Sequence, residues 1–288
     1  MIDDRTSGLV NGLAGVMIFA GSLPATRVAV ADFDPLFLTL ARAAIAGLLG
    51  LVLLLLFREK RPLPTDLLPL LAVSLCVVIG FPLLTALALR HVTAAHSIVF
   101  IGLLPLATAL FGVLRGGERP RPAFWLLSGL GSALVVGFAL SQGFAGSPTG
   151  DLLMLAAIIV CGWGYAEGAT LSRRLGGWQV ISWALILALP VTAGLALATR
   201  PDSLAETGLP AWLGLAYVSL FSMLIGFVLW YRGLAQGGIA AVGQLQLLQP
   251  FFGLALAGLL LGETVTWPML IASAAVAACV AGARRFAR

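Results

Sequence analysis

The feature that most constrains this 288-residue chain is a succession of apolar runs separated by short polar breaks. An apolar run of about 20 residues spans the hydrocarbon core of a bilayer as a helix, whereas a barrel strand is shorter and alternates apolar with polar residues. Only helices and closed barrels satisfy every backbone polar group in lipid. The sequence therefore predicts an all-α integral membrane protein with ten transmembrane helices, near residues 8–30, 34–57, 66–89, 93–115, 122–141, 150–172, 177–199, 209–231, 239–261 and 266–283.

Composition supports a lipid environment and argues against a soluble protein. Hydrophobic residues make up 60% of the chain and charged residues 10%, against about 25% charged residues in a soluble domain. The net charge of +5 comes from basic residues that stand singly or in short clusters between the apolar runs, which is typical of loop charge and not of a nucleic-acid-binding surface. The expected partners are the lipid bilayer and a small-molecule substrate, with no nucleic acid. The oligomeric state stays open, with a monomer as one candidate.

No cofactor or metal site is expected. Cys76, Cys161 and Cys279 each lie inside an apolar run and do not have the spacing of metal ligands. They are interpreted as small apolar packing residues.

The basic residues also predict the orientation of the chain, because cytoplasmic loops carry an excess of Arg and Lys. Thirteen basic residues fall in the breaks on one side of the membrane and three on the other: Arg27, Arg90 and Arg200. Both termini are therefore predicted to be cytoplasmic, in the inner membrane of a bacterium.

An internal repeat appears when the chain is shifted by 145 residues. Six identical pairs then align without a gap: Ala95 with Ala240, Pro105 with Pro250, Gly117 with Gly262, Glu118 with Glu263, Ser128 with Ser273 and Gly137 with Gly282. Each copy holds five helices, so the second copy must start from the opposite face of the membrane. Residues 8–141 and 150–283 are thus expected to be two inverted repeats, an arrangement that many secondary transporters use.

These motifs resemble a known family. Both halves resemble the EamA repeat of the drug/metabolite transporter superfamily, with a small or Trp-Gly turn in the first helix (Ala20-Gly21-Ser22; Trp163-Gly164-Tyr165), a later proline helix and a Gly-Glu pair. Within that superfamily the chain looks closest to YddG-type amino-acid exporters. The resemblance implies export of small amphipathic metabolites, including aromatic amino acids, by alternating access. One departure is that Ala20 stands where the second copy has Trp163, so the halves are not expected to line a cavity symmetrically.

Three other classes of function are compared with secondary transport. ATP-driven transport would need a phosphate-binding loop with a lysine after glycine, but Lys60 is the only lysine in the sequence and lies in Arg-Glu-Lys-Arg. A membrane-embedded enzyme would need converging catalytic groups at membrane depth, and the sequence has neither a metalloprotease nor a serine-hydrolase motif. A helical scaffold or assembly factor needs no motif and remains the first alternative, with a membrane-embedded enzyme as the second.

Ionisable residues inside the membrane are functional candidates, because burying them is costly. Three qualify: Arg42, His96 and Glu167. Arg42 would suit a carboxylate, His96 would hydrogen-bond a polar group of the solute, and Glu167 is a candidate for proton coupling. Arg42 and Glu167 also have a purely structural interpretation. Arg42 would extend outward to the membrane–water interface, and Glu167 would form hydrogen bonds with neighbouring helices.

The remaining candidates are aromatic, amide and hydroxyl residues within the predicted spans. Trp163, Tyr165 and Phe81 are expected to pack against the apolar part of the solute, while Ser22, Gln244 and Gln246 are expected to bind its polar part. Pro105 and Pro250, at matched positions of the two repeats, are predicted hinges. Proline removes one backbone hydrogen bond and clashes one turn back, so a helix bends more easily there.

Overall fold

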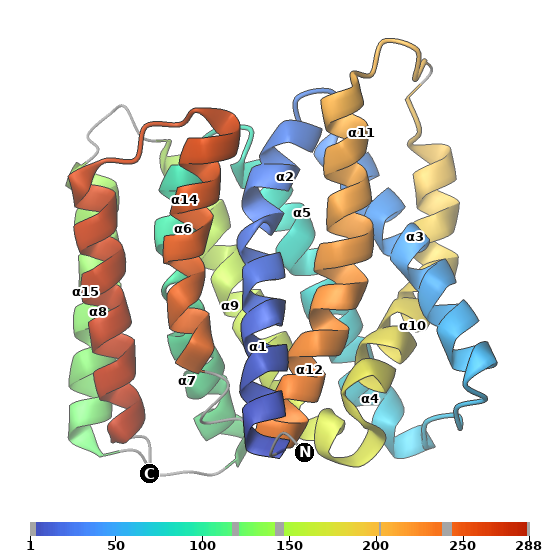
Figure 1. The fold of residues 1–288 in the computed structure, drawn as a ribbon, viewed down its shortest axis with the longest axis horizontal. Coiled ribbons are helices and arrows are strands. Elements are labelled where there is room, and N and C mark those ends of the chain that lie inside the picture. The colour runs from blue at the N-terminus through green and yellow to red at the C-terminus, as the bar shows by residue number, and fades with distance from the viewer. Residues whose placement is uncertain (1–3, 117–120, 142–146, 202, 238–243, 287–288) are drawn as a thin grey trace.

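A computed structural model describes residues 4–116, 121–141, 147–201, 203–237 and 244–286. In this part of the chain every regular element is helical, and the elements form ten consecutive apolar segments. Helix α1 begins and α15 ends at the lower face of the molecule in Figure 1, whereas α2 ends at the upper face. The predicted all-α fold of ten helices is confirmed.

The first five segments form one half of the molecule. Three of them are each divided into two or three helices. Their bounds are α1 (Asp4–Ala20) with α2 (Ser22–Ala29), α3 (Pro35–Leu56), α4 (Pro64–Val73) with the π-helix η1 (Ser74–Gly80) and α5 (Phe81–Ala88), α6 (Ala94–Ile101) with α7 (Leu104–Gly116), and α8 (Pro122–Ser141).

The second half repeats this order, although its first segment is a single helix and the described part of its fourth segment begins with a 3-10 helix. The bounds are α9 (Pro148–Leu175), α10 (Gly177–Ala198), α11 (Leu209–Ala216) with the π-helix η3 (Tyr217–Ile225) and α12 (Gly226–Gly237), the 3-10 helix η4 (Gln244–Leu248) with α14 (Gln249–Leu261), and α15 (Trp267–Arg285).

Six of the described segments are long and apolar enough to cross a membrane by length and composition: Thr6–Ala29, Pro35–Leu56, Pro64–Ala88, Pro148–Leu175, Gly177–Ala198 and Leu209–Gly233. Shorter apolar helices run over Ala94–Thr108, Leu245–Leu261 and Trp267–Cys279. The molecule is a multi-pass membrane protein.

The polar breaks between runs also start the helices. The Asp34 side chain accepts hydrogen bonds from the amides of Leu36 at 2.8 Å and Phe37 at 3.3 Å, and Pro35 occupies the first turn of α3. The Thr93 side chain accepts from the amide of His96 at 3.1 Å at the start of α6. Such caps satisfy amides that have no partner within the helix.

Helix packing follows the exchange of the two halves. Helix α1 packs on α12 and α9 packs on α5, while α3 pairs with α10 and α8 with α15. Exchanging the halves converts the first contact into the second and leaves the other two pairs unchanged. In Figure 1, α8 and α15 stand together at one edge of the bundle. This packing is what two inverted repeats require.

Small residues allow the closest contact between the halves. A Cβ atom at Gly15 would lie 3.1 Å from the backbone nitrogen of Trp230, and one at Gly233 would lie 2.6 Å from that of Gly12. Helices α1 and α12 therefore meet backbone to backbone, as membrane helices do through small residues. Large side chains such as Leu55 and Leu68 are exposed on the outside, where lipid would cover them.

Candidate solute-binding site

The first membrane segment is broken near its middle, between α1 and α2. Pro24, in the first turn of α2, has no amide to continue the helix, and Gly21 occupies the break. The hydroxyl of Tyr217 donates a hydrogen bond to the carbonyl of Ile18 at 2.8 Å, and a Cβ at Gly21 would collide with this hydroxyl. A residue of the second half therefore gives a second hydrogen bond to a carbonyl beside the break, which also accepts from the amide of Gly21 at 3.2 Å.

The fourth and ninth segments are interrupted at matched places. Helix α6 ends at Ile101 and α7 begins at Leu104, and the 3-10 helix η4 ends at Leu248, directly before α14. Each following helix carries a proline at its second position, which suits the first turn of a helix but not its interior. The two helices α7 and α14 therefore begin inside the bundle.

The third and eighth segments carry matched π-helices. Shifted by 145 residues, η1 (Ser74–Gly80) falls within η3 (Tyr217–Ile225). Single π-helical turns are frequent at functional sites because they re-aim side chains. Val77 and Ser222, which occupy equivalent positions in the two π-helices, both face the same cavity.

That cavity lies between the halves, where these irregular segments meet. Its walls come from seven of the ten segments: Phe19, Ser22, Leu23, Arg42, Val77, Phe81, Pro82, Ile101, Leu104, Cys161, Tyr165, Ser222, Met223, Phe227 and Gln249. It encloses about 30 Å³, enough for about two water molecules. The protein is thus closed around the cavity in this conformation.

A buried arginine supplies the charge of the cavity. Arg42, on α3, is 4% exposed, and its Nη2 donates to Ser222 Oγ at 3.3 Å. Ser222 Oγ in turn donates to Ser22 Oγ at 2.9 Å. Arg42 Nε has no hydrogen-bond partner, and no carboxylate of the described residues lies within ion-pair distance of this guanidinium.

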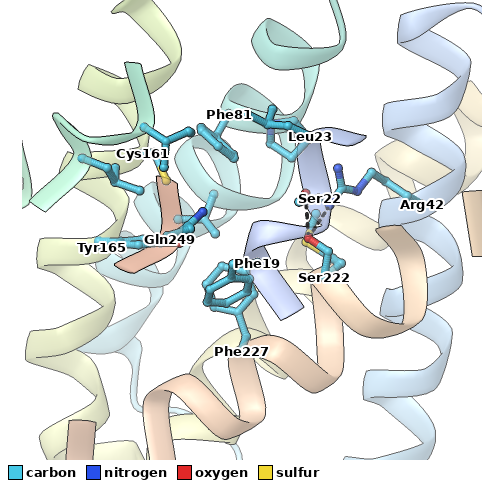
Figure 2. Close-up of a pocket in the computed structure, with 15 residues that line it drawn as sticks. Phe19, Ser22, Leu23, Arg42, Phe81, Cys161, Tyr165, Ser222, Phe227 and Gln249 are labelled. Atoms are coloured by element: carbon cyan, nitrogen blue, oxygen red, sulfur yellow. Dashed lines mark hydrogen bonds between the residues drawn. The ribbon is translucent and has the colours of Figure 1, made fainter. Parts of the chain in front are cut away.

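The labelled residues of the cavity form groups on opposite sides in Figure 2, and the charge of Arg42 lies on one side only. Figure 2 shows the chain of Arg42, Ser222 and Ser22 on one side, and Tyr165, Cys161 and Gln249 on the other. The rings of Phe19 and Phe227 pack edge to face below these groups in this view, with their centroids 4.9 Å apart. Such a cavity is complementary to an amphipathic molecule.

Four of the expected site residues meet at this cavity: Ser22, Arg42, Phe81 and Tyr165. Trp163 does not. It is 43% exposed, its ring stacks on Phe111 with centroids 6.3 Å apart, and its Nε1 donates to Glu167 Oε1 at 3.3 Å. Side chains two positions apart on a helix point about 200° apart, so Trp163 and Tyr165 of α9 cannot face the same cavity.

His96 and Glu167 are also placed outside the cavity. His96 lines a separate hollow of about 510 Å³ at the upper face, and its Nε2 lies 2.6 Å from Asp151 Oδ1. Glu167 is buried on α9, next to Trp163. Its part in proton coupling stays a prediction.

Of the four amide and proline candidates, the structure describes the side chains of two, Gln246 and Pro250. Gln246 is buried with its Nε2 unpaired and does not line the cavity, whereas Gln249 does. Pro250 is buried in the first turn of α14. The side chains of Gln244 and Pro105 lie outside the described set, and the hinge roles stay predictions.

Several cavity residues were not expected from the sequence, chiefly Phe19, Cys161, Ser222, Phe227 and Gln249. A signal existed for Gln249, because it directly precedes Pro250, at the start of a helix inside the membrane. None existed for Ser222, whose place depends on the register of a π-helix.

Broken helices in inverted halves, meeting at a small closed cavity in the middle of a multi-pass bundle, define the class of membrane transporters. The sequence profile of the EamA-like transporter family matches residues 6–140 and again residues 148–284. The chain belongs to the EamA-like transporter family.

Relatives and a solved structure agree with this assignment. An uncharacterized transporter, YdeK of Bacillus subtilis, is 69% identical over 287 residues, covering 100% of both chains. A probable terminal-alkyne amino-acid exporter of Streptantibioticus cattleyicolor is 26% identical over 255 residues, covering 86% of this chain and 83% of that protein. One solved structure, described only as a crystal structure of a protein, has a TM-score of 0.67 at 22% identity and covers 97% of this chain and 98% of its own; it supports the fold.

Proposed function

We propose that this transporter exports small amphipathic metabolites that carry a carboxylate, amino acids including aromatic ones, by alternating access. The observation that carries the proposal is Arg42, a buried guanidinium that lines the cavity and has only a serine hydroxyl as hydrogen-bond partner among the described residues. A carboxylate would complete its coordination, because guanidinium and carboxylate match in a two-point geometry.

The electrostatics of the cavity favour an anionic group. A charge buried without a counter-charge is costly, so a solute carboxylate that pairs with Arg42 gains more than it would in water. Leu104 and Gln249, which line the cavity, belong to the first turns of α7 and α14. The amino ends of these helices add partial positive charge, as half-helices do in other transporters.

The other walls suit the rest of an amino acid. Phe19, Phe81 and Phe227 would contact an apolar or aromatic side chain. Ser22 and Gln249 carry oxygen atoms that would accept hydrogen bonds from an ammonium group. The relative that is described as an amino-acid exporter adds support for this substrate class.

Alternating access is supported by the inverted halves, 8–141 and 150–283, with the cavity between them. A cavity of about 30 Å³ is far below the roughly 300 Å³ of a small-molecule site, so binding requires one face to open. We place the lower face, with both termini, on the cytoplasmic side of a bacterial inner membrane. Labelling of single cysteines in the loop holding Arg58 by an impermeant reagent added outside intact cells would contradict this orientation.

Flux assays in proteoliposomes test the function. The purified protein would be supplied with labelled L-amino acids, with and without a pH gradient, together with the amide derivative of any amino acid that moves. We expect Arg42→Gln to reduce flux of the acid at least about thirtyfold, because losing one partner of a buried charge pair costs about 2 kcal/mol or more.

Two controls make the result specific. Arg200→Gln, at the end of α10 outside the cavity, should leave flux unchanged, and the amide derivative should be a poor substrate of the wild-type protein. Wild-type flux by Arg42→Gln would contradict the carboxylate site. If the wild-type protein moved no solute under any gradient, the scaffold alternative would be favoured.

A further inference from the structure

Helix α9 is tied to the first half at both ends. At 28 residues it is the longest described helix. In its first turn, Asp151 Oδ1 lies 2.6 Å from Nε2 of His96 on α6. In its last turn, Arg174 lies 2.6 Å from Asp66 of α4, a carboxylate whose side chain is 1% exposed. One tie therefore lies at the upper face and one at the lower face.

The upper tie differs from the lower one because it can change charge. An imidazole gains or loses a proton between about pH 5 and 8, whereas a guanidinium stays charged. The side chains of His96 and Asp151 are 7% and 16% exposed, and the His96 ring lies 5.6 Å from the ring of Phe100 and 5.3 Å from that of Phe138. The pair is thus shielded on one side by apolar rings.

Water reaches the pair from the other side. His96 lines the hollow of about 510 Å³ at the upper face, which we name the vestibule. Charged and titratable groups from the elements around α6 face this region, namely Arg27 of α2, Arg90 and His91 before α6, Asp151 of α9 and Glu263 after α14. Of these, Arg27 donates to the carbonyl of Leu89, and Glu263 accepts from the amides of Ala94 at 3.1 Å and Ala95 at 2.7 Å. His96 is the residue that contacts Asp151.

The pair has no counterpart in the other repeat. The shift of 145 residues relates His96 to Ala241 and Asp151 to Thr6. Inverted repeats would otherwise give closely similar contacts at the two faces. A charge-changing contact at one face alone makes the balance between the two open states depend on pH.

We propose that His96 and Asp151 form a proton-binding site that holds the upper face closed when a proton is bound. The inference rests on the proposed alternating access. Neutral His96 donates one N–H to the Asp151 carboxylate; a proton from vestibule water then binds the second ring nitrogen, and the pair becomes imidazolium and carboxylate. The added proton turns a hydrogen bond from a neutral donor into an ion pair, and opposite charges attract each other strongly where water is largely excluded. Loss of the proton to the vestibule weakens the contact of α6 with α9, and this face opens.

The test measures opening directly and needs no solute. Spin labels would be placed at the exposed positions Ala31 and Thr149, through Ala31→Cys and Thr149→Cys, in full-length protein without the three native cysteines. Distances would be recorded in lipid nanodiscs from pH 5 to pH 8. We expect the ratio of open to closed populations in otherwise wild-type protein to rise about fivefold or more over this range.

Matched variants separate the proton site from general effects. His96→Gln and Asp151→Asn should each abolish the pH response while remaining folded, as checked by thermal unfolding. Asp34→Asn breaks an exposed contact with Arg90 at 3.9 Å, formed within the first half at the same face, and should keep the response. Asp66→Asn should favour opening of the lower face. It should also keep the pH response of the upper face.

The outcomes are distinct from those for the proposed function. A wild-type protein without a pH response, or a His96→Gln variant with the full response, would overturn the proton site even if amino acids are transported. If no amino acid moves but the labels respond to pH through His96 alone, the proton site stands and the substrate proposal fails.

Discussion

The first helices of the two halves occupy equivalent places but are built differently. The first half has α1 and α2, broken at Gly21 with Pro24 just beyond, whereas α9 runs unbroken for 28 residues. The shift of 145 residues places Gly21 on Ala166 and Pro24 on Ala169, and the match of the two turns places them on Gly164 and Glu167. In either alignment the second half lacks the proline that interrupts the first. The fold does not require the break. We infer that α1–α2 can bend at the cavity, whereas α9 moves as one rigid element.

The largest effect is expected where both halves are broken alike, in the fourth and ninth segments. Pro105→Ala or Pro250→Ala would supply a backbone amide at the break and remove the proline ring, so that the two helical pieces of the segment could join into one stiffer helix. We expect solute exchange in proteoliposomes to slow at least about tenfold, while the free energy of solute binding changes by less than about 1.4 kcal/mol.

Pro190 supplies the control for this prediction, because it lies inside α10, which continues through it without a break. Pro190→Ala should change exchange less than twofold. Unaltered exchange in both Pro105→Ala and Pro250→Ala would show that these prolines are static kinks.

The next effect concerns Gly21, which distinguishes the two first helices. In Gly21→Ala the new methyl group collides with Tyr217 Oη, and overpacking of this kind costs about 1–3 kcal/mol. We expect the unfolding free energy of the purified protein to fall by that amount. Gly194→Ala, where an added Cβ meets nothing within 4 Å, should instead stabilise α10 slightly. Equal behaviour of the two variants would mean that the break has no steric basis.

A smaller effect is expected at Tyr217 itself. Tyr217→Phe removes the donor to the Ile18 carbonyl and should cost about 1 kcal/mol of unfolding free energy. It also removes the nearest of the atoms that Gly21→Ala would strike, while the ring carbon Cζ, 2.8 Å from the added Cβ, remains. The double variant should therefore be more stable than the sum of the single effects predicts, and strict additivity would argue against this contact.

The smallest effect is expected on the outer side of α9. Trp163→Ala should change solute flux less than about twofold, whereas Tyr165→Ala, on the opposite side of the same helix, should reduce it clearly. Comparing the flux of the Trp163→Ala and Tyr165→Ala variants shows which side of α9 contacts the solute during transport. A greater loss with Trp163→Ala would move the site away from the cavity.

Sequence reasoning located the helices because length and apolar composition alone determine what can span a bilayer. It indicated a small-residue turn at Ala20-Gly21-Ser22 but neither the contact of Tyr217 with this turn nor the π-helices, since these depend on how a helix packs against its neighbours. Tyr217 is 199 positions from the carbonyl it satisfies, and no periodicity in the sequence reports such a contact.

The cavity was predicted in part for the same reason. Arg42 and Tyr165 stand out as polar or aromatic groups at membrane depth, so residue type was sufficient to propose them. Asp151 was not proposed, because it lies in the first turn of its helix and resembles a loop carboxylate. Only the three-dimensional contact with His96 distinguishes it from one.

The single buried charge of Arg42 has an electrical consequence. An amino acid with both a carboxylate and an ammonium group adds no net charge, so the cavity carries the positive charge of Arg42 whether it is empty or loaded, and the membrane field falls across whichever side of the cavity is closed. Moving a full elementary charge through the field is worth about 2.3 kcal/mol per 100 mV, so even a fraction of that charge would make the return of the empty carrier sensitive to voltage. The cell's resting potential would then act on the loaded step as well as on the unloaded one.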